Sequence, residues 1–297
     1  MHHTQLRSFH AVATEGGFTA AAKSLKIGQP TVTSQVKALE DYFGVELFHR
    51  RGRGVQLTEV GLSLLAVTQR LFSLQEEAVD LLNAAGGFHA GHLRVGAVGP
   101  YHATEMLARF NERYPEMKVS VMIGNSQEVL QGLLDFRSDI AILARVEADP
   151  RFYAKPYSRH PVVVFVNMDH PWANRKSVRI EDLEGQRMVL REVGSTTRLA
   201  LEGALAKAGV TIDPVMEIGS REAVWLAVVQ GIGIGVVSEI EFIAHPKLRP
   251  LTVSNAELYT YAHVVCLEER KEARLIRAFL QMVDEILARR RQRTPAG

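Results

Sequence analysis

Three consecutive hydroxyl side chains, Ser195, Thr196 and Thr197, stand between Gly194 and Arg198 at the start of a predicted helix. A helix N-cap uses one hydroxyl, so three beside a cation exceed what capping requires. The first N–H groups of a helix lack partners within the helix and attract anions, and an arginine binds carboxylate or phosphate oxygens in pairs. This stretch therefore predicts a site for a small anion that carries a carboxylate, phosphonate or phosphate group.

Three further polar stretches stand where a predicted strand is followed by a predicted helix. Ligands of open α/β sheets bind beyond the carboxyl ends of the strands, so these stretches are predicted to line the same site. Asn125 with Glu128 fits a helix capping box equally well. The predicted effector-binding residues are Gly99, Pro100, Tyr101, Asn125, Ser126, Ser195, Thr196, Thr197, Arg198, Ser220 and Arg221.

A second set of polar residues lies on a short helix, for which Pro30 suits the first position. Val32, Val36 and Leu39 recur at helical spacing and predict one buried stripe. The opposite side is small, rich in hydrogen-bonding groups and charged only at one lysine, so it can enter a DNA major groove and contact base edges. Any amphipathic helix also has a polar outer face. The predicted base-reading residues are Gln29, Pro30, Thr31, Thr33, Ser34 and Lys37.

The neighbouring segments complete a three-helix unit with a hairpin. The preceding helix, residues 18–25, is predicted to end at Lys26-Ile27-Gly28, where the glycine makes the turn. Residues 43–58 consist of two short apolar segments around a basic, glycine-rich tip, which is typical of a wing. The tip residues predicted to contact phosphates or a minor groove are Arg50, Arg51 and Arg53.

A long helix is predicted to follow, from a Thr58 cap to the glycine pair Gly86-Gly87. Its apolar residues alternate in spacings of four and three, which is the a/d pattern of a coiled coil. A helix in a simple core usually has a wider stripe, so the pattern favours pairing between two copies of the chain. The predicted dimer-forming residues are Val60, Leu64, Val67, Leu71, Leu74, Ala78 and Leu81.

Composition and the remaining pattern limit the classes of function. With 297 residues, 46% of them apolar, the chain has material for about two domains, and strands alternate with helices from Leu93 onward. This alternation predicts parallel α/β sheets with helices on both faces. The single Cys266 excludes internal disulfides and cysteine-rich zinc sites. No base and nucleophile occur in a catalytic pattern, so we expect neither enzyme activity nor a metal or cofactor.

The N-terminus lacks the pattern of a signal peptide, and no apolar run is long enough for a membrane helix, so we expect a cytoplasmic protein without a membrane partner. Residues 1–58 hold seven Lys and Arg against four Asp and Glu, while the remainder is close to neutral. Such a modest excess on one copy binds DNA weakly at physiological salt. Two or more copies on each DNA site are therefore expected.

The segment AAKSLKIGQPTVTSQVKALEDYFGVELFHRRGRGVQLTEVG resembles, nearly position for position, the winged helix-turn-helix of LysR-type transcriptional regulators. It departs at Gly28, where that family usually carries a serine as helix cap. The resemblance implies an α+β multidomain chain whose C-terminal α/β domain is similar to periplasmic binding proteins. The implied domains are a winged helix-turn-helix over 1–58, a linker and dimerisation helix over 59–88, and an effector-binding domain over 89–297, with subdomain I about 91–161 plus 268–297 and subdomain II about 162–267.

The same resemblance implies the partners of the chain. They are double-stranded DNA, a small anionic effector and further copies of the chain in a homodimer or homotetramer, with RNA polymerase as an additional candidate. The motifs QPTVTSQVKALE, GNSQEVL, GSTTR and GSREAV look like the LysR-type subgroup associated with aminoethylphosphonate catabolism. That likeness implies 2-aminoethylphosphonate or a related metabolite as effector. Its amine would then meet an acid, with Glu192, Glu217 and Asp139 as open alternatives.

Two other classes of function are weighed against a transcriptional regulator. A small-molecule binding or transport protein would use only the α/β domain, and it would leave the N-terminal module and the heptads without a role. An enzyme built on the α/β domain would need a nucleophile and a base, which the sequence does not offer. Both alternatives are disfavoured.

Overall fold

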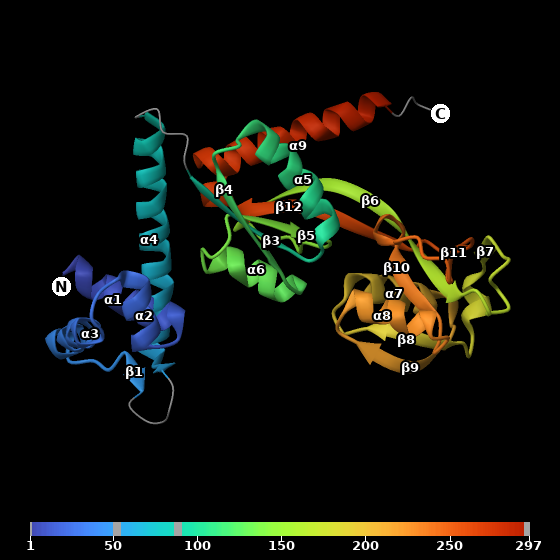
Figure 1. The fold of residues 1–297 in the computed structure, drawn as a ribbon, viewed down its shortest axis with the longest axis horizontal. Coiled ribbons are helices and arrows are strands. Elements are labelled where there is room, and N and C mark those ends of the chain that lie inside the picture. Colours follow the sequence, from blue (N-terminus) through green and yellow to red (C-terminus); the bar gives the residue numbers. More distant parts are fainter. Residues whose placement is uncertain (1, 50–54, 86–90, 294–297) are drawn as a thin grey trace. The chain divides into compact units, whose positions relative to one another are not determined.

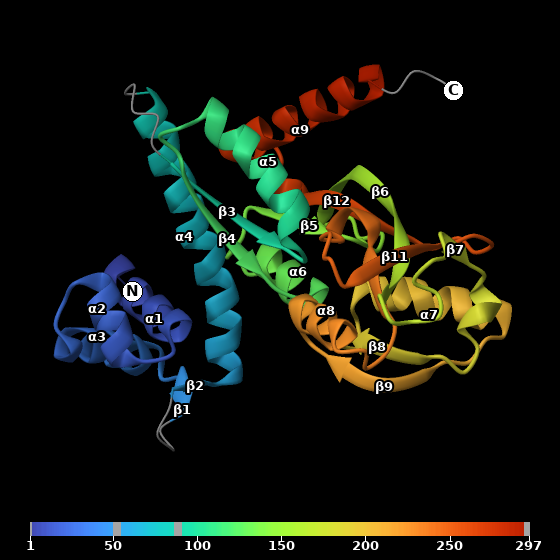
Figure 2. The same cartoon turned by 45° about the vertical axis from the view of Figure 1, so that its right-hand side comes forward.

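The computed structural model describes residues 2–49, 55–85 and 91–293. The chain divides into two compact units, residues 1–88 and 89–297 (Figures 1 and 2). The elements of the first unit are α1 (His3–Glu15), α2 (Phe18–Leu25), α3 (Gln29–Phe43), β1 (Phe48–His49), β2 (Gln56–Leu57) and α4 (Glu59–Ala85).

The first unit is a three-helix core with a hairpin and a long helix. Phe9 from α1, Val32 from α3 and Leu47 are almost fully buried together. β1 pairs antiparallel with β2, as expected for the flanks of a wing. The hydroxyl of Thr58 accepts a hydrogen bond from the backbone N–H of Gly61 at 3.0 Å, so it caps α4 as the sequence predicts.

The turn between α2 and α3 differs from the sequence prediction in one detail. The residue in the left-handed conformation is Lys26, with φ 57°, and its backbone N–H closes α2 on the carbonyls of Ala22 and Lys23. Gly28 has an ordinary φ of −66° and serves as the N-cap of α3. The hydrogen bonds that close α2 hold a lysine where a glycine would be less strained.

The second unit is a mixed α/β structure. Its elements are β3 (His92–Ala97), α5 (Pro100–Arg113), β4 (Lys118–Ile123), α6 (Ser126–Leu134), β5 (Ile140–Leu143), β6 (Phe152–Asn167), β7 (Ser177–Val178), η1 (Ile180–Leu183), β8 (Arg187–Arg191), α7 (Thr196–Ala208), β9 (Asp213–Ile218), α8 (Arg221–Val229), β10 (Gly235–Ser238), η2 (Glu239–Glu241), β11 (Leu248–Val253), β12 (Tyr259–Leu267), η3 (Glu268–Arg270) and α9 (Arg274–Arg293). Their main sheet has the order β4-β3-β5-β12-β6-β11-β7, and β10 also pairs with β6.

Two lobes share this sheet. We call residues 91–161 with 259–293 lobe I, and residues 162–258 lobe II. In lobe I, α5 and α9 cover one face of the sheet around Phe110 and Phe279, while α6 covers the other face (Figure 1). In lobe II, α7 packs on one side of the strands around Leu201, and α8 packs on the other side around Phe165.

The sequence predicted a parallel arrangement, and the structure is mixed instead. β3 pairs in parallel with β4 and β5, and β8 with β9, but β6 pairs antiparallel with β10, β11 and β12. The long strand β6 runs from lobe I into lobe II, whereas β12 lies in lobe I. Ala262, Val264 and Cys266 lie in the core of lobe I, so β12 joins that lobe, and lobe II ends near Leu258, earlier than the expected position of about 267.

Among the described helices, none combines the length and the apolar character needed to cross a membrane.

Candidate functional site

The polar face predicted for α3 lies open in the first unit. Val32, Val36 and Leu39 are at most 2% exposed, so the opposite side of the helix is presented to solvent. The exposed residues on that side are Gln29, Pro30, Thr31, Thr33, Ser34 and Lys37. The hydroxyls of Thr33 and Ser34 donate to backbone carbonyls of the same helix, and their oxygens can still accept hydrogen bonds. This surface has the chemistry needed to contact base edges and phosphates.

The wing is described only at its base. Phe48 lies opposite Leu57, and His49 lies opposite Gln56, in the antiparallel pair of β1 and β2. The predicted phosphate contacts Arg50, Arg51 and Arg53 lie outside the described residues.

The apolar stripe predicted on α4 is largely uncovered in the single chain. Val60, Val67, Leu71, Leu74 and Leu81 are between 39% and 64% exposed. Ala78 is exposed too, while Leu64 is half-buried against the helix-turn-helix core. Large apolar side chains in such a row mark an interaction surface.

In the second unit, a cavity of about 630 Å³ collects most of the predicted effector residues. It is lined from both lobes, because Pro100, Asn125 and Ser126 belong to lobe I, whereas the hydroxyls before and within α7 belong to lobe II. The lining residues are Val98, Pro100, Ile123, Gly124, Asn125, Ser126, Glu128, Arg191, Glu192, Gly194, Ser195, Thr196, Thr197, Gly219, Ser220, Arg221 and Glu222. Tyr101 is not among them, and Gly99 lines a smaller cavity.

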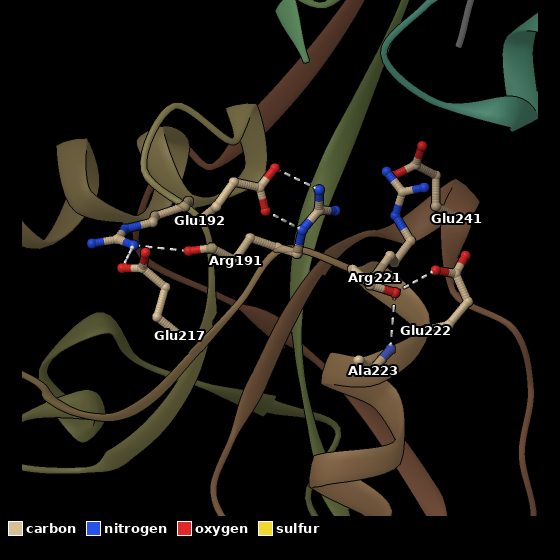
Figure 3. A network of polar contacts seen from close by, with 9 residues as sticks. Arg191, Glu192, Glu217, Arg221, Glu222, Ala223 and Glu241 are labelled. Carbon is tan, nitrogen blue, oxygen red and sulfur yellow. Dashed lines mark hydrogen bonds and ion pairs between the residues drawn. The ribbon is translucent and has the colours of Figure 1, made fainter. Parts of the chain in front are cut away.

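Three helix N-termini on this cavity differ in how they are capped. Asn125 accepts the backbone N–H of Glu128 at 2.9 Å, and the Glu128 carboxylate accepts the N–H of Asn125, so α6 has the predicted capping box. The hydroxyl of Ser220 accepts the N–H of Ala223 and caps α8 (Figure 3). Ser195 makes no side-chain cap on α7. The first N–H groups of α7 therefore remain available for an anion.

Two arginines line the cavity, and Arg198 is not one of them. The Arg198 guanidinium donates from Nε to Glu202 at 2.6 Å and from Nη1 to Glu217 at 2.6 Å. These contacts tie the start of α7 to β9, and Arg198 is not among the residues that line the cavity. Arg191 and Arg221 are the guanidinium groups at the cavity.

Of the three acids considered for an effector amine, Glu192 alone lines the cavity. It accepts two hydrogen bonds from Arg191, at 2.7 and 2.8 Å (Figure 3). Burial raises the pKa of Glu192, but the hydrogen bonds and charge of Arg191, a backbone hydrogen bond and the charge of Arg221 together lower it below its usual value. Glu217 is engaged by Arg198, and Asp139 lies buried in lobe I, where it accepts from Arg94.

Comparison with known proteins assigns both units. Residues 3–62 match the family described as "Bacterial regulatory helix-turn-helix protein, lysR family", and residues 86–288 match the family described as "LysR substrate binding domain". The chain belongs to the LysR family. It is a DNA-binding transcriptional regulator, as the resemblance of its N-terminal segment implies.

Similar proteins support this assignment along most of the chain. The transcriptional activator CmpR of Synechocystis sp. is 31% identical over 255 residues, which are 85% of this chain and 84% of CmpR. The regulator CbbR of Xanthobacter flavus is 33% identical over 260 residues, covering 84% of this chain and 77% of CbbR. Because such relatives are named as regulators of transcription, the expectation that the chain is not an enzyme is confirmed.

Two solved structures share the fold. Full-length CbnR in complex with its target DNA has a TM-score of 0.72 at 22% identity, with 96% of this chain and 99% of that one covered. The CcmR regulatory domain of Synechocystis PCC6803 in complex with 2-PG has a TM-score of 0.60 at 24% identity, covering 66% of this chain and 96% of that one. The first confirms the predicted architecture of a helix-turn-helix followed by a substrate-binding domain, and the second confirms the fold of the substrate-binding domain alone.

Proposed function

We propose that this LysR-family regulator binds double-stranded DNA as a dimer and responds to a small anionic effector at the N-terminus of α7. The observation that carries the proposal is the convergence of the three hydroxyls Ser195, Thr196 and Thr197 on one cavity, at a helix end without a side-chain cap. Arg191 and Arg221 add positive charge to the same cavity. An oxyanion placed there meets N–H donors, hydroxyls and a guanidinium together.

The DNA-binding half of the proposal rests on the open face of α3 and the open stripe of α4. Two copies paired along α4 present two α3 helices, which doubles the phosphate contacts on one duplex. The chain would act in the cytoplasm and, through DNA-bound dimers or tetramers, affect recruitment of RNA polymerase. An effector that favours one arrangement of the DNA-bound assembly by about 1–3 kcal/mol would change transcription measurably.

For the identity of the effector, 2-aminoethylphosphonate is our first candidate. The short motifs that suggested it line the cavity at Asn125, Ser126, Thr196 and Ser220. A zwitterion also suits a cavity that offers both guanidinium groups and the carboxylates of Glu128, Glu192 and Glu222. The second candidate is 2-PG, because a similar regulatory domain binds it.

A thermal-shift and calorimetric titration of the full chain tests this assignment. The panel is 2-aminoethylphosphonate, phosphonoacetate, 2-PG, inorganic phosphate, β-alanine and taurine. A ligand at a hundredfold its dissociation constant should add about 2.7 kcal/mol to the free energy of unfolding. Stabilisation by the aminophosphonate alone supports the first candidate, and stabilisation by carboxylates or sulfonates alone removes it while the anion site remains.

Thr196→Val is the matched test of the site itself. Valine keeps the shape of threonine and removes one hydroxyl from the cavity, so affinity for the anion that binds should fall about tenfold. Thr104→Val is the control, since the Thr104 hydroxyl donates to the backbone of its own helix and lies outside the cavity lining. Arg198→Ala should weaken binding less, because it acts through α7. Equal affinity in wild type and Thr196→Val would refute the placement of the anion.

A further inference from the structure

Arg221 borders two cavities of the second unit. It lines the large cavity and also a small adjoining one of about 40 Å³, which Thr196 and Thr197 border as well. Glu241, on η2, lines only the small cavity. Its Oε2 lies 3.1 Å from Nη2 of Arg221, and both side chains are less than one-fifth exposed (Figure 3). The guanidinium of Arg221, which faces the proposed anion, is thus already paired with the carboxylate of Glu241.

This pair packs against the backbone at Gly99. A Cβ at Gly99 would lie 2.9 Å from Oε1 of Glu241 and 3.5 Å from Nη2 of Arg221. The side chains of Arg221 and Glu241 therefore occupy the space next to Gly99, the N-cap of α5. An effector anion that binds Arg221 has to compete with this contact.

The two cavity arginines are held with different strength. Arg191 makes two short hydrogen bonds to Glu192, whose pKa is lowered. Arg221 makes one contact, at 3.1 Å, and burial raises the pKa of Glu241, although Arg221 and Arg191 oppose that rise. The pairing with Arg221 thus does not fully offset the cost of burying the charged carboxylate of Glu241. An added anion should exchange with Glu241 more easily than with Glu192.

The small cavity offers the carboxylate of Glu241 a second position. The hydroxyls of Ser238 and Thr260 line it, together with His102. The Nδ1 atom of His102 is buried, and within the described parts of the chain it has no hydrogen-bond partner. Its other nitrogen, Nε2, lies 3.3 Å from the hydroxyl of Ser158, and if that hydroxyl donates, Nδ1 carries the proton. A carboxylate that leaves Arg221 would find donors in this cavity.

We propose that Glu241 is an internal competitor for the effector's anionic group. Without effector its carboxylate neutralises Arg221, and on binding the anion takes Arg221 while Glu241 turns toward His102 in the small cavity. The exchange rests on the proposed function, because it requires an anion in the large cavity. It makes Glu241 a residue that sets affinity and selects for groups able to outcompete a carboxylate, such as phosphonate, phosphate or sulfonate.

The test is a titration of the full chain with sulfate, whose charge is constant between pH 6 and 8, and with the phosphonates of the panel. Glu241→Gln keeps the shape of the side chain and removes the competing charge, so both kinds of anion should bind about tenfold more tightly. Glu241→Asp, which draws the carboxylate back from Arg221, should show a smaller gain and serves as the second variant. Unfolding midpoints establish that each variant is folded.

Glu239→Gln is the matched control, because Glu239 is exposed on the same short turn, η2, and is not among the lining residues of either cavity. It reports the general effect of removing one negative charge, and its gain should stay below about twofold. In an Arg221→Gln background, Glu241→Gln should bring no gain. A gain that persists there, or one that Glu239→Gln matches, would overturn the proposal.

The outcomes separate this proposal from the proposed function. If anions bind wild type and Glu241→Gln with the same affinity, or bind the variant more weakly, Glu241 only positions Arg221 and the competitor role is refuted while the anion site stands. If no anion binds either protein, both proposals fail together.

Discussion

Replacing Leu74 with glutamate should weaken the pairing of two copies of the chain along α4. Leu74 is 51% exposed in the single chain and lies in the middle of the apolar stripe. Full burial of a leucine side chain contributes about 1.5–3 kcal/mol, so covering the open half contributes roughly half of that for each copy. Because a two-fold dimer carries the change twice, the total loss is about 1.5–3 kcal/mol, before the cost of burying two carboxylates is added.

This free energy corresponds to an increase of about 10- to 100-fold in the dimer dissociation constant. Sedimentation equilibrium of the full chain over a range of concentrations measures that constant directly. The matched control is Ala66→Glu, which places the same charge at an exposed position of α4 outside the stripe. The control should leave the dissociation constant close to that of wild type.

Two results would refute the reasoning. An unchanged dissociation constant for Leu74→Glu would show that the stripe does not lie in the interface. An equal rise in the dissociation constant for Ala66→Glu would show that a charge anywhere on α4 is sufficient to weaken the dimer. The heptad pattern would then have no role in pairing.

Three further predictions concern stability and DNA binding. Asp139→Asn should lower the free energy of unfolding by about 3–5 kcal/mol, because it removes the charge of a buried carboxylate that accepts from both Arg94 and Arg270, whereas Asp149→Asn, at a residue that pairs with exposed Arg151, should not. Burial alone would raise the pKa of Asp139, but its arginine partners lower it. The stability that wild type has over Asp139→Asn should therefore be complete above about pH 4, and it should be lost as the pH falls through the lowered pKa. Lys37→Ala should weaken binding to non-specific duplex DNA and reduce the slope of log affinity against log salt by about 0.9. Gly61→Ala would place a Cβ 2.2 Å from the carbonyl oxygen of Leu47, and denaturant unfolding should show a loss of about 1–3 kcal/mol.

Patterns that depend on nearby residues were predictable from the sequence. The buried stripe of α3, the Thr58 cap and the Asn125 capping box each follow from contacts within one or two turns of a helix. The gathering of the polar junctions at one cavity was also predictable. It follows from the rule that parallel strands end at the same edge of a sheet, which holds for β3 with β4 and for β8 with β9.

Which of Arg198 and Arg221 lines the cavity depends on residues far away in the sequence. Both arginines stand at the start of a helix, and only the fold brings Glu217 to the first and Glu241 to the second. One local signal was present, since Glu202 stands four residues after Arg198 and pairs with it. Glu241 lies in a short turn after β10, where no motif marked it.

Only the last part of the long strand β6 has the sequence pattern of a strand, the run of valines from 162 onward. Pro156 and Pro161 interrupt the residues before that run, and proline normally argues against a strand. Here β12 supplies the pairing, with a shift of register beside His263, which lies opposite Pro156. That partner is about a hundred residues away in the sequence, so no local pattern shows it.

The two ends of lobe II meet, because the N–H of Val162 donates to the carbonyl of Leu258 at 2.9 Å. A segment that leaves and re-enters a fold at adjacent points behaves as an inserted module. Lobe II can accordingly be exchanged with that of a relative by two cuts, at 161/162 and 258/259, without lengthening either connection. Chimeras of this kind would replace α7, α8 and both arginines of the cavity while they keep the DNA-reading unit of this chain.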